Sequence, residues 1–235
     1  MPILMAILWG TLTPALMLAV HKYWVPKLLH NADESAGHEP HPQQSTPGLI
    51  KPRVQFLKKC AIWTACVLFA FICGYKAAEY ASSGWSFYRL WLVFSVFACL
   101  TVTDAERMLI PNECSLVLLA GGSIWMIGLW VIAGEFPIWT LAACLISMVT
   151  MLLGLLLIKA FAKAGLGMGD IKIISALSFV CGIRTGCYVM IIAMVLSALC
   201  SSLMLVAKKR GLKDLLPLGP FMWVALGSSI IFKLI

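Results

Sequence analysis

Hydrophobic residues in this chain come in long uninterrupted blocks, not in alternating or striped patterns. A helix of a water-soluble protein shows apolar positions every three or four residues, and a half-buried strand shows strict alternation. Residues 1–20, by contrast, contain no charged side chain at all. A helix needs about 20 mostly apolar residues to cross a hydrocarbon core of roughly 30 Å, so this block is typical of a transmembrane helix.

Seven further apolar blocks follow, at about residues 59–80, 86–103, 113–133, 137–160, 170–183, 186–207 and 217–234. The block at 170–183 is short, and glycine and proline interrupt the last one, so we expect seven or eight transmembrane segments. Backbone polar groups cannot stay unpaired in lipid, and no block shows the alternation of a β-barrel. The sequence therefore predicts an all-α fold, a polytopic membrane helix bundle.

Composition and charge support this class. The chain of 235 residues is 61% hydrophobic and 12% charged, whereas a soluble domain is roughly half apolar and a quarter charged. The first block has no basic residue before it and is followed by Lys22 and Lys27. We therefore interpret it as a membrane anchor with its N-terminus outside, and not as a cleaved signal peptide.

The basic residues predict the orientation of the other segments. With eight segments and the N-terminus outside, all but four of the 18 lysines and arginines lie on the cytoplasmic side. The exceptions are Lys76, Arg89, Arg184 and Lys233. This asymmetry follows the positive-inside rule. The net charge of +8 is thus explained by topology and by attraction to anionic membrane lipid, and we expect no nucleic-acid partner.

The division of the chain follows from these blocks. We predict an N-terminal transmembrane anchor at 1–20, a cytoplasmic loop at 21–58 and a membrane-embedded bundle at 59–235. The loop contains His38 and His41, which a metal could use, but a solvated and poorly ordered loop is the simpler interpretation. None of the nine cysteines forms a C-x-x-C pair, so we expect no metal site.

Acidic residues near the membrane segments are candidates for function, because each costs a few kcal/mol at bilayer depth unless it is paired or hydrated. Asp104, Glu106, Glu113 and Asp170 are of this kind. The simplest explanation is that they are solvated interface charges or are paired with Arg107 and Lys172. Asp104 and Asp170 differ from the others in their neighbours, and the predicted topology places both on the cytoplasmic face.

Asp104 ends the third segment, and Pro111 and Asn112 begin the fourth, with Asn112 as a plausible helix cap. Asp170 opens the sixth segment and follows glycines at positions 165, 167 and 169. Glycine at every second position allows a positive φ and a close approach of another chain. A peptidase requires such an approach, because it must lay an extended substrate beside its catalytic acid.

Three motifs in this order resemble those of the type IV prepilin peptidases, which are G-x-G-D membrane aspartic peptidases. The first is Asp104 followed by Pro111 in the sequence Ile-Pro-Asn, and the second is Gly167-x-Gly169-Asp170-x-Lys172. The third is Pro217-x-Gly219-Pro220 followed by an aromatic residue. Together they cover roughly residues 86–225, and each lies at a predicted cytoplasmic membrane edge.

The resemblance implies an aspartic endopeptidase of the prokaryotic cytoplasmic (inner) membrane, with 59–235 as its peptidase bundle. Such enzymes remove the short basic leader from type IV prepilins or pseudopilins on the cytoplasmic side. By motif, Asp104 and Asp170 are the catalytic pair, and Pro111, Gly167, Gly169, Lys172, Pro217, Gly219 and Pro220 support them. The sequence assigns no oligomeric state and does not distinguish a pilus from a secretion or DNA-uptake system.

Longer members of the family carry two C-x-x-C pairs in a cytoplasmic loop and also methylate the new N-terminus with S-adenosylmethionine. This chain has a loop in the equivalent place without those cysteines. The peptidase reaction needs no cofactor, and S-adenosylmethionine is expected only if methylation is retained, which the sequence leaves open.

Two nearby carboxyl groups share a proton, so one acts as base toward water and the other as acid toward the scissile carbonyl. Asp170 begins a helix, whose positive end favours the carboxylate, and Asp104 ends one, which favours the neutral acid. Helix ends alone therefore predict that Asp170 is the base and that Asp104 carries the proton.

Three alternatives remain at this point. A presenilin-like or signal-peptide-peptidase-like intramembrane protease also uses a G-x-G-D aspartate, but its acids are expected in mid-span. A carboxylate-dependent proton or ion transporter would use the aspartates as ion ligands and predicts further polar residues at mid-depth. A structural membrane protein would keep both aspartates in ion pairs.

Overall fold

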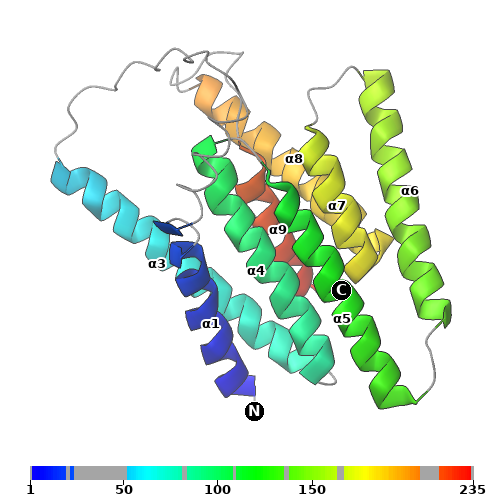
Figure 1. The fold of residues 1–235 in the computed structure, drawn as a ribbon. Helices are drawn as coiled ribbons and strands as arrows, with labels where there is room; N and C mark the ends of the chain where they lie inside the picture. The colour runs from blue at the N-terminus through cyan, green and yellow to red at the C-terminus, as the bar shows by residue number, and fades with distance from the viewer. Residues whose placement is uncertain are drawn as a thin grey trace.

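The computed structural model describes residues 2–19, 22–23, 52–80, 84–107, 110–134, 138–162, 167–206 and 217–233. These residues form eight α-helices and no strand, which confirms the all-α prediction (Figure 1). The helices are α1 (Pro2–Ala19), α3 (Pro52–Tyr80), α4 (Gly84–Arg107), α5 (Asn112–Ala133), α6 (Ile138–Ala162), α7 (Met168–Cys181), α8 (Ile183–Val206) and α9 (Gly219–Ile231).

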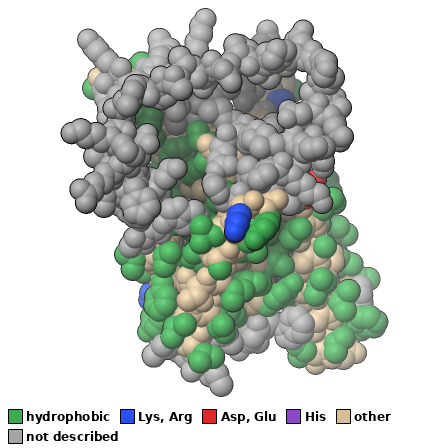
Figure 2. Space-filling model, turned by 60° about the vertical axis from the view of Figure 1, so that its left-hand side comes forward, with side chains coloured by type: hydrophobic (Ala, Val, Ile, Leu, Met, Phe, Trp, Pro, Cys, Tyr) green, Lys and Arg blue, Asp and Glu red, His purple; other side chains and the backbone are tan. Residues whose placement is uncertain are grey.

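Four of the helices are long and apolar enough to cross a membrane, over Ser86–Ala105, Asn112–Ile132, Ile138–Phe161 and Ile183–Val206. They also expose large apolar side chains. On α6, for example, Trp139 is 86% exposed and Phe161 is 85% exposed. Hydrophobic side chains cover much of the described surface in Figure 2. Soluble proteins rarely expose so much apolar surface, so the arrangement fits a membrane helix bundle.

Some helix boundaries differ from the sequence prediction. Helix α3 begins at Pro52 and not near residue 59, so the last part of the predicted loop is helical. Proline suits the first turn of a helix because its missing N–H would have no partner there. Hydrophobicity marks only the membrane-facing part of such a helix and misses its polar extension. The candidate site at His38 and His41 lies outside the described residues.

Two short helices form the centre of the bundle. Helix α7 has 14 residues and α9 has 13, and at 1.5 Å per residue each spans only about 20 Å. Most of their side chains are buried. Helix α7 packs against α5, α6 and α8, and α9 packs against α3, α4 and α8. The two short central helices are therefore held in place by long outer ones.

An aromatic cluster fixes α9 against the first half of the chain. The ring centroids of Phe94 and Trp223 are 5.2 Å apart, those of Phe94 and Trp9 are 5.3 Å apart, and those of Phe69 and Trp223 are 5.0 Å apart. Inside a membrane, packing of this kind must hold helices together because lipid is as apolar as the side chains. The cluster thus sets where α9 begins relative to α4.

The ends and starts of these helices gather on one side of the molecule. In Figure 1, α4 and α6 end, and α5, α7 and α9 begin, at the same end of the bundle. Since both candidate aspartates lie in these terminal turns, the fold brings the two halves of the predicted site to one end.

Candidate active site

Asp104 is a buried carboxyl group in the last turn of α4. Its side chain is only 5% exposed. The backbone N–H of Gly219, the first residue of α9, donates a hydrogen bond to Asp104 Oδ2 at 2.6 Å. The first N–H groups of a helix have no partner within that helix. Asp104 therefore caps α9 from a position 115 residues away in the chain.

Gly219 fits this place because it has no side chain. A Cβ at this position would lie 2.9 Å from Asp104 Cβ and 3.0 Å from Asp104 Oδ2, which is too close without a shift. The hydroxyl of Thr101, one turn before Asp104, lies 3.4 Å from the carbonyl oxygen of Gly219. Pro220 stands in the first turn of α9, where a missing N–H costs nothing. Pro217 and Pro220 flank the turn that presents Gly219 to Asp104.

Asp170 is held by its own helix start. It lies in the first turn of α7, and its Oδ2 accepts a hydrogen bond from the backbone N–H of Gly167 at 3.2 Å. Gly167 is the N-cap residue, so this contact is one half of a capping box. The Asp170 side chain is partly exposed. The structure thus confirms that Asp170 begins a helix.

The glycines beside Asp170 act through small size and not through an unusual backbone. Gly167 has a φ of −65°, and the described glycines with positive φ are Gly134 and Gly182. The expectation of positive φ is therefore wrong for Gly167 and Gly169. The expected close approach is present, because a Cβ on Gly169 would lie 2.7 Å from Cβ of Ile110.

Lys172 bonds to an amide and not to an acid. Its Nζ donates to Asn112 Oδ1 at 3.1 Å. Asn112 is the first residue of α5, and the N-cap is Pro111, which makes no side-chain cap bond. The prediction that Asn112 is the helix cap is therefore wrong. The suggested ion pair between Lys172 and an aspartate is absent among the described side chains, and the Arg107 side chain lies outside the described part.

The three sequence motifs meet at this end of the bundle. Ile110, just before Pro111, packs on Gly169, and Asn112 bonds to Lys172. These contacts join the first motif to the second, and Gly219 joins the third motif to Asp104. The structure therefore unites stretches separated by up to 115 residues.

The two aspartates influence each other electrostatically. Asp170 lies at the start of α7, outside the four helices of membrane-crossing length. Burial, and then the nearby Asp104 carboxylate, raise the pKa of Asp170 to about 6. The N–H of Gly167 and the charge of Lys159 act in the opposite direction. Two coupled carboxyl groups hold a proton between them at a pH where isolated ones would be ionised.

The structure adds a second helix end to the comparison of the two aspartates, which the sequence made from α4 and α7 alone. Asp104 does lie in the C-terminal turn of α4, but it also faces the N-terminus of α9, whose positive end favours a carboxylate. Its hydrogen bond to Gly219 is short, and charge-assisted bonds of this kind stabilise the ionised form. The pKa of Asp170 is raised to about 6 by burial and by the nearby Asp104, so Asp170 is also suited to hold the shared proton.

Sequence reasoning missed several contributors to this site. Ile110 adjoins the first motif and could have been found as the apolar residue before Pro111. Thr101 and Lys159 carried no local signal, because their roles depend on contacts between helices. Among the described residues, no group of three or more histidine, cysteine or acidic side chains could hold a metal.

Comparison with known proteins gives two findings. Residues 91–202 match the type IV leader peptidase family, and this stretch includes both Asp104 and Asp170. Proteins named prepilin leader peptidase/N-methyltransferase from Aeromonas salmonicida strain A449 and from Aeromonas hydrophila are each 28% identical over 154 residues. Each alignment covers 63% of this chain and 52% of the relative. The chain thus spans about half the length of the curated relatives it matches. No solved structure matches it.

Proposed function

Since residues 91–202 match the type IV leader peptidase family, we propose that the protein is a membrane aspartic endopeptidase. Its substrates are type IV prepilins or pseudopilins, from which it removes the short basic leader. The observation that carries this proposal is that the three motifs meet at one end of the bundle, where Asp104 and Asp170 lie. Both acids lie in terminal turns, as expected for a leader peptidase and not for a protease with mid-span acids.

The proposed mechanism uses the two carboxyl groups in different protonation states. Asp104, ionised and held by the Gly219 N–H, takes a proton from a water molecule, and the resulting hydroxide attacks the scissile carbonyl carbon. Asp170 gives its proton to the carbonyl oxygen as the tetrahedral intermediate forms. As the intermediate collapses, the C–N bond breaks, the proton on Asp104 passes to the leaving amine, and a hydroxyl group of the intermediate returns a proton to Asp170 as the new carboxyl group forms. The pair is thereby ready to share one proton again.

Orientation in the membrane forms part of the proposal. Seven or eight segments with the N-terminus outside place the active-site end of the bundle in the cytoplasm, as the bias of basic residues indicates. A basic leader of a substrate would remain on that side of an inner membrane for the same reason. The following apolar segment of the substrate would lie in lipid, so the scissile bond would reach the membrane surface where Asp104 and Asp170 lie.

A second activity, methylation of the new N-terminus, is named in the relatives but has little support in the described residues. S-adenosylmethionine carries a positively charged sulfonium, which a site should meet with acidic or aromatic groups. A cavity between α5, α6 and α7, lined in part by Lys172, offers a positive charge and mostly aliphatic side chains. The described residues at this cavity therefore do not fit the cofactor, and we assign no step to it.

Co-expression tests the proposed function directly. The full chain is expressed in a host that lacks its own prepilin peptidase, together with candidate prepilins, and mass spectrometry determines the N-terminus of each. We expect a shortened product that begins at one defined residue, and an unmodified precursor when the peptidase is omitted. The same spectra report an added methyl group. Precursors that stay intact with every tested prepilin would contradict the proposal.

A further inference from the structure

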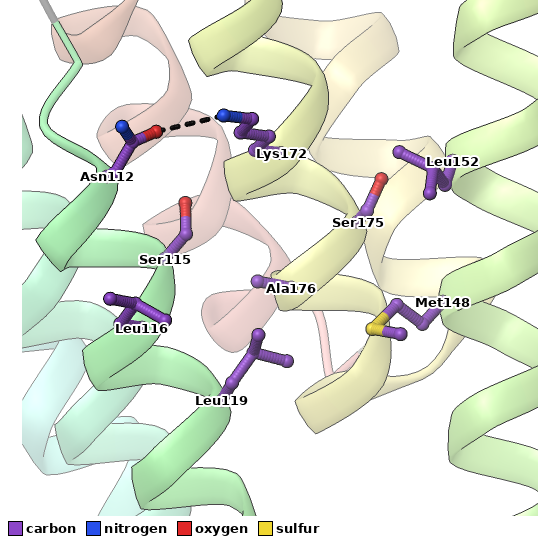
Figure 3. Close-up of a pocket in the computed structure, with 9 residues that line it drawn as sticks. All are labelled: Asn112, Ser115, Leu116, Leu119, Met148, Leu152, Lys172, Ser175 and Ala176. Atoms are coloured by element: carbon purple, nitrogen blue, oxygen red, sulfur yellow. Dashed lines mark hydrogen bonds between the residues drawn. The ribbon is translucent and has the colours of Figure 1, made fainter.

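A cavity of about 300 Å³ lies between α5, α6 and α7, and neither Asp104 nor Asp170 is among its lining residues. Helix α7 forms its floor, and α5 and α6 form its sides (Figure 3). Most of the lining is aliphatic, from Leu116, Leu119, Met148, Leu152 and Ala176. Since α5 and α6 are of membrane-crossing length, this lining would face lipid chains.

One end of the cavity is polar and positively charged. Lys172 and Asn112 lie together there, joined by their hydrogen bond (Figure 3). An ammonium group has three donors, so Lys172 keeps two for a ligand after bonding to Asn112. The cavity also reaches the first turn of α5, where unpaired backbone N–H groups favour an anion.

A buried hydroxyl provides a second, independent indication of a ligand. Ser115 lines the cavity and is only 8% exposed, yet its Oγ has no hydrogen-bond partner among the described residues. A buried polar atom without a partner costs about 1–3 kcal/mol. In Figure 3 the Ser115 hydroxyl points toward the end that carries Asn112 and Lys172. A bound oxygen-rich group at this end would satisfy it.

The cavity lies on a different face of α7 from the active site. Successive helix residues are turned by about 100°, so Lys172 points roughly opposite to Asp170, two positions earlier. A substrate helix would fill the space with only a few of its residues. A helix about 10 Å wide occupies roughly 120 Å³ per residue, so the cavity would hold about two or three of its residues. A single acyl chain is much thinner.

We infer that this cavity binds one anionic glycerophospholipid, with its phosphate at Lys172, Asn112 and Ser115 and one acyl chain along the aliphatic lining. The positive charge, the unpartnered hydroxyl and the narrow apolar space together match a ligand with one anionic head and a thin tail. The lipid fills the gap between α5 and α6 and so supports α7 from the side opposite Asp170.

Native mass spectrometry of the full chain in detergent tests this site without a cleavage assay, so its outcome is separate from that of the proposed function. The probes are phosphatidylglycerol and a diacylglycerol with the same acyl chains. We expect one phosphatidylglycerol to bind about tenfold more tightly than the diacylglycerol. Lys172→Gln should remove this preference, because it keeps a polar, hydrogen-bonding side chain but loses the charge. Lys159→Gln, which removes a charge from α6 outside the cavity, should retain the preference.

Leu119→Trp provides a second test on the apolar side. The larger side chain should fill the cavity and weaken the binding of both lipids. Thermal unfolding is used to show that the protein remains folded. Equal binding of the two lipids to the unaltered protein would overturn the inference. An equal loss of the preference for phosphatidylglycerol in Lys172→Gln and in Lys159→Gln would also overturn it, because it would indicate only general charge attraction. One-for-one displacement of phosphatidylglycerol by a prepilin N-terminal peptide would show that the cavity belongs to the substrate.

Discussion

Asp104 and Asp170 reach the same end of the bundle, but their surroundings are built in different ways. Asp104 is buried in the last turn of α4 and is held by the backbone of a distant helix, with a hydrogen bond of 2.6 Å from Gly219. Asp170 is partly exposed and is held by its own helix start, with a longer bond of 3.2 Å from Gly167. One position depends on tertiary packing and the other on local sequence.

This difference suggests separate tasks for the two acids. A buried carboxylate that is fixed by a short backbone bond is well suited to hold a water molecule as a base. A more accessible carboxyl group with a raised pKa is suited to give a proton to an incoming substrate. Each prediction below alters one of the two environments and asks whether the other responds.

The largest effect is expected from removing either acid. Asp104→Asn and Asp170→Asn should each slow prepilin cleavage by about 1,000-fold, because each deletes one half of general acid–base catalysis. The rate is measured with purified protein and a prepilin that is cut in cells. Equal thermal unfolding of the variants and the unaltered protein would exclude misfolding. A variant that kept near-normal activity would remove that aspartate from the mechanism.

The next largest effect concerns the tertiary support of Asp104. Gly219→Ala should lower kcat by about 100-fold, since the new Cβ would displace the carboxylate and small misplacements of a catalytic group cost this much. Gly227→Ala is a matched control in the same helix, where the added Cβ meets the Phe69 ring. It should lower thermal stability without changing the pH profile of kcat. Equal pH profiles for both variants would contradict a positioning role for Gly219.

A smaller effect is expected from the local support of Asp170. Gly167→Ala places a Cβ 2.8 Å from Asp170 Oδ2, but an alanine tolerates the backbone angles found there. The partly exposed carboxyl group can turn aside, so we expect a loss of roughly tenfold or less. Activity assays of Gly167→Ala and Gly219→Ala side by side measure the difference. A larger loss for Gly167→Ala would reverse the comparison.

The smallest expected effect is a shift in the pH dependence of kcat/KM. If Asp170 is the acid, it must be protonated, so kcat/KM should fall as the pH rises through about 6, the raised pKa of this group. Lys159 acts to lower that pKa, so Lys159→Gln should shift the basic limb of the profile to higher pH. The pH profile of kcat/KM is recorded in a series of buffers that spans pH 6, all at the same ionic strength. A shift to lower pH would contradict the assignment of the proton to Asp170.

These two environments also differ in how far the sequence could predict them. The helix start at Asp170 is visible in its Gly-x-Gly-Asp stretch, because capping acts over three residues. The bond from Gly219 to Asp104 joins positions 115 residues apart, and no local pattern indicates it. The sequence therefore predicted the two acids and their helix ends, but its division of roles between them could not include the N-terminus of α9 beside Asp104.

In the fold, too, features set by local sequence were predicted and features set by contacts between helices were not. Long apolar blocks predicted α4, α5, α6 and α8 closely, because crossing a membrane imposes a length. The polar start of α3 at Pro52 was missed, as was the bond between Lys172 and Asn112. Both depend on polar groups, for which hydrophobicity carries no information. Resemblance of three motifs supplied the peptidase hypothesis, but only their contacts explain why Gly219 and Gly169 must be small.

The central claim is that Asp104 and Asp170 act as one catalytic unit on a prepilin. The most direct test is the cleavage rate of one purified prepilin by the unaltered protein, the two single Asp→Asn variants and the double variant. Residues that act as a unit are not additive, so the double variant should be no slower than the slower single variant. A double variant whose loss equals the product of the two single losses would show that the aspartates act independently.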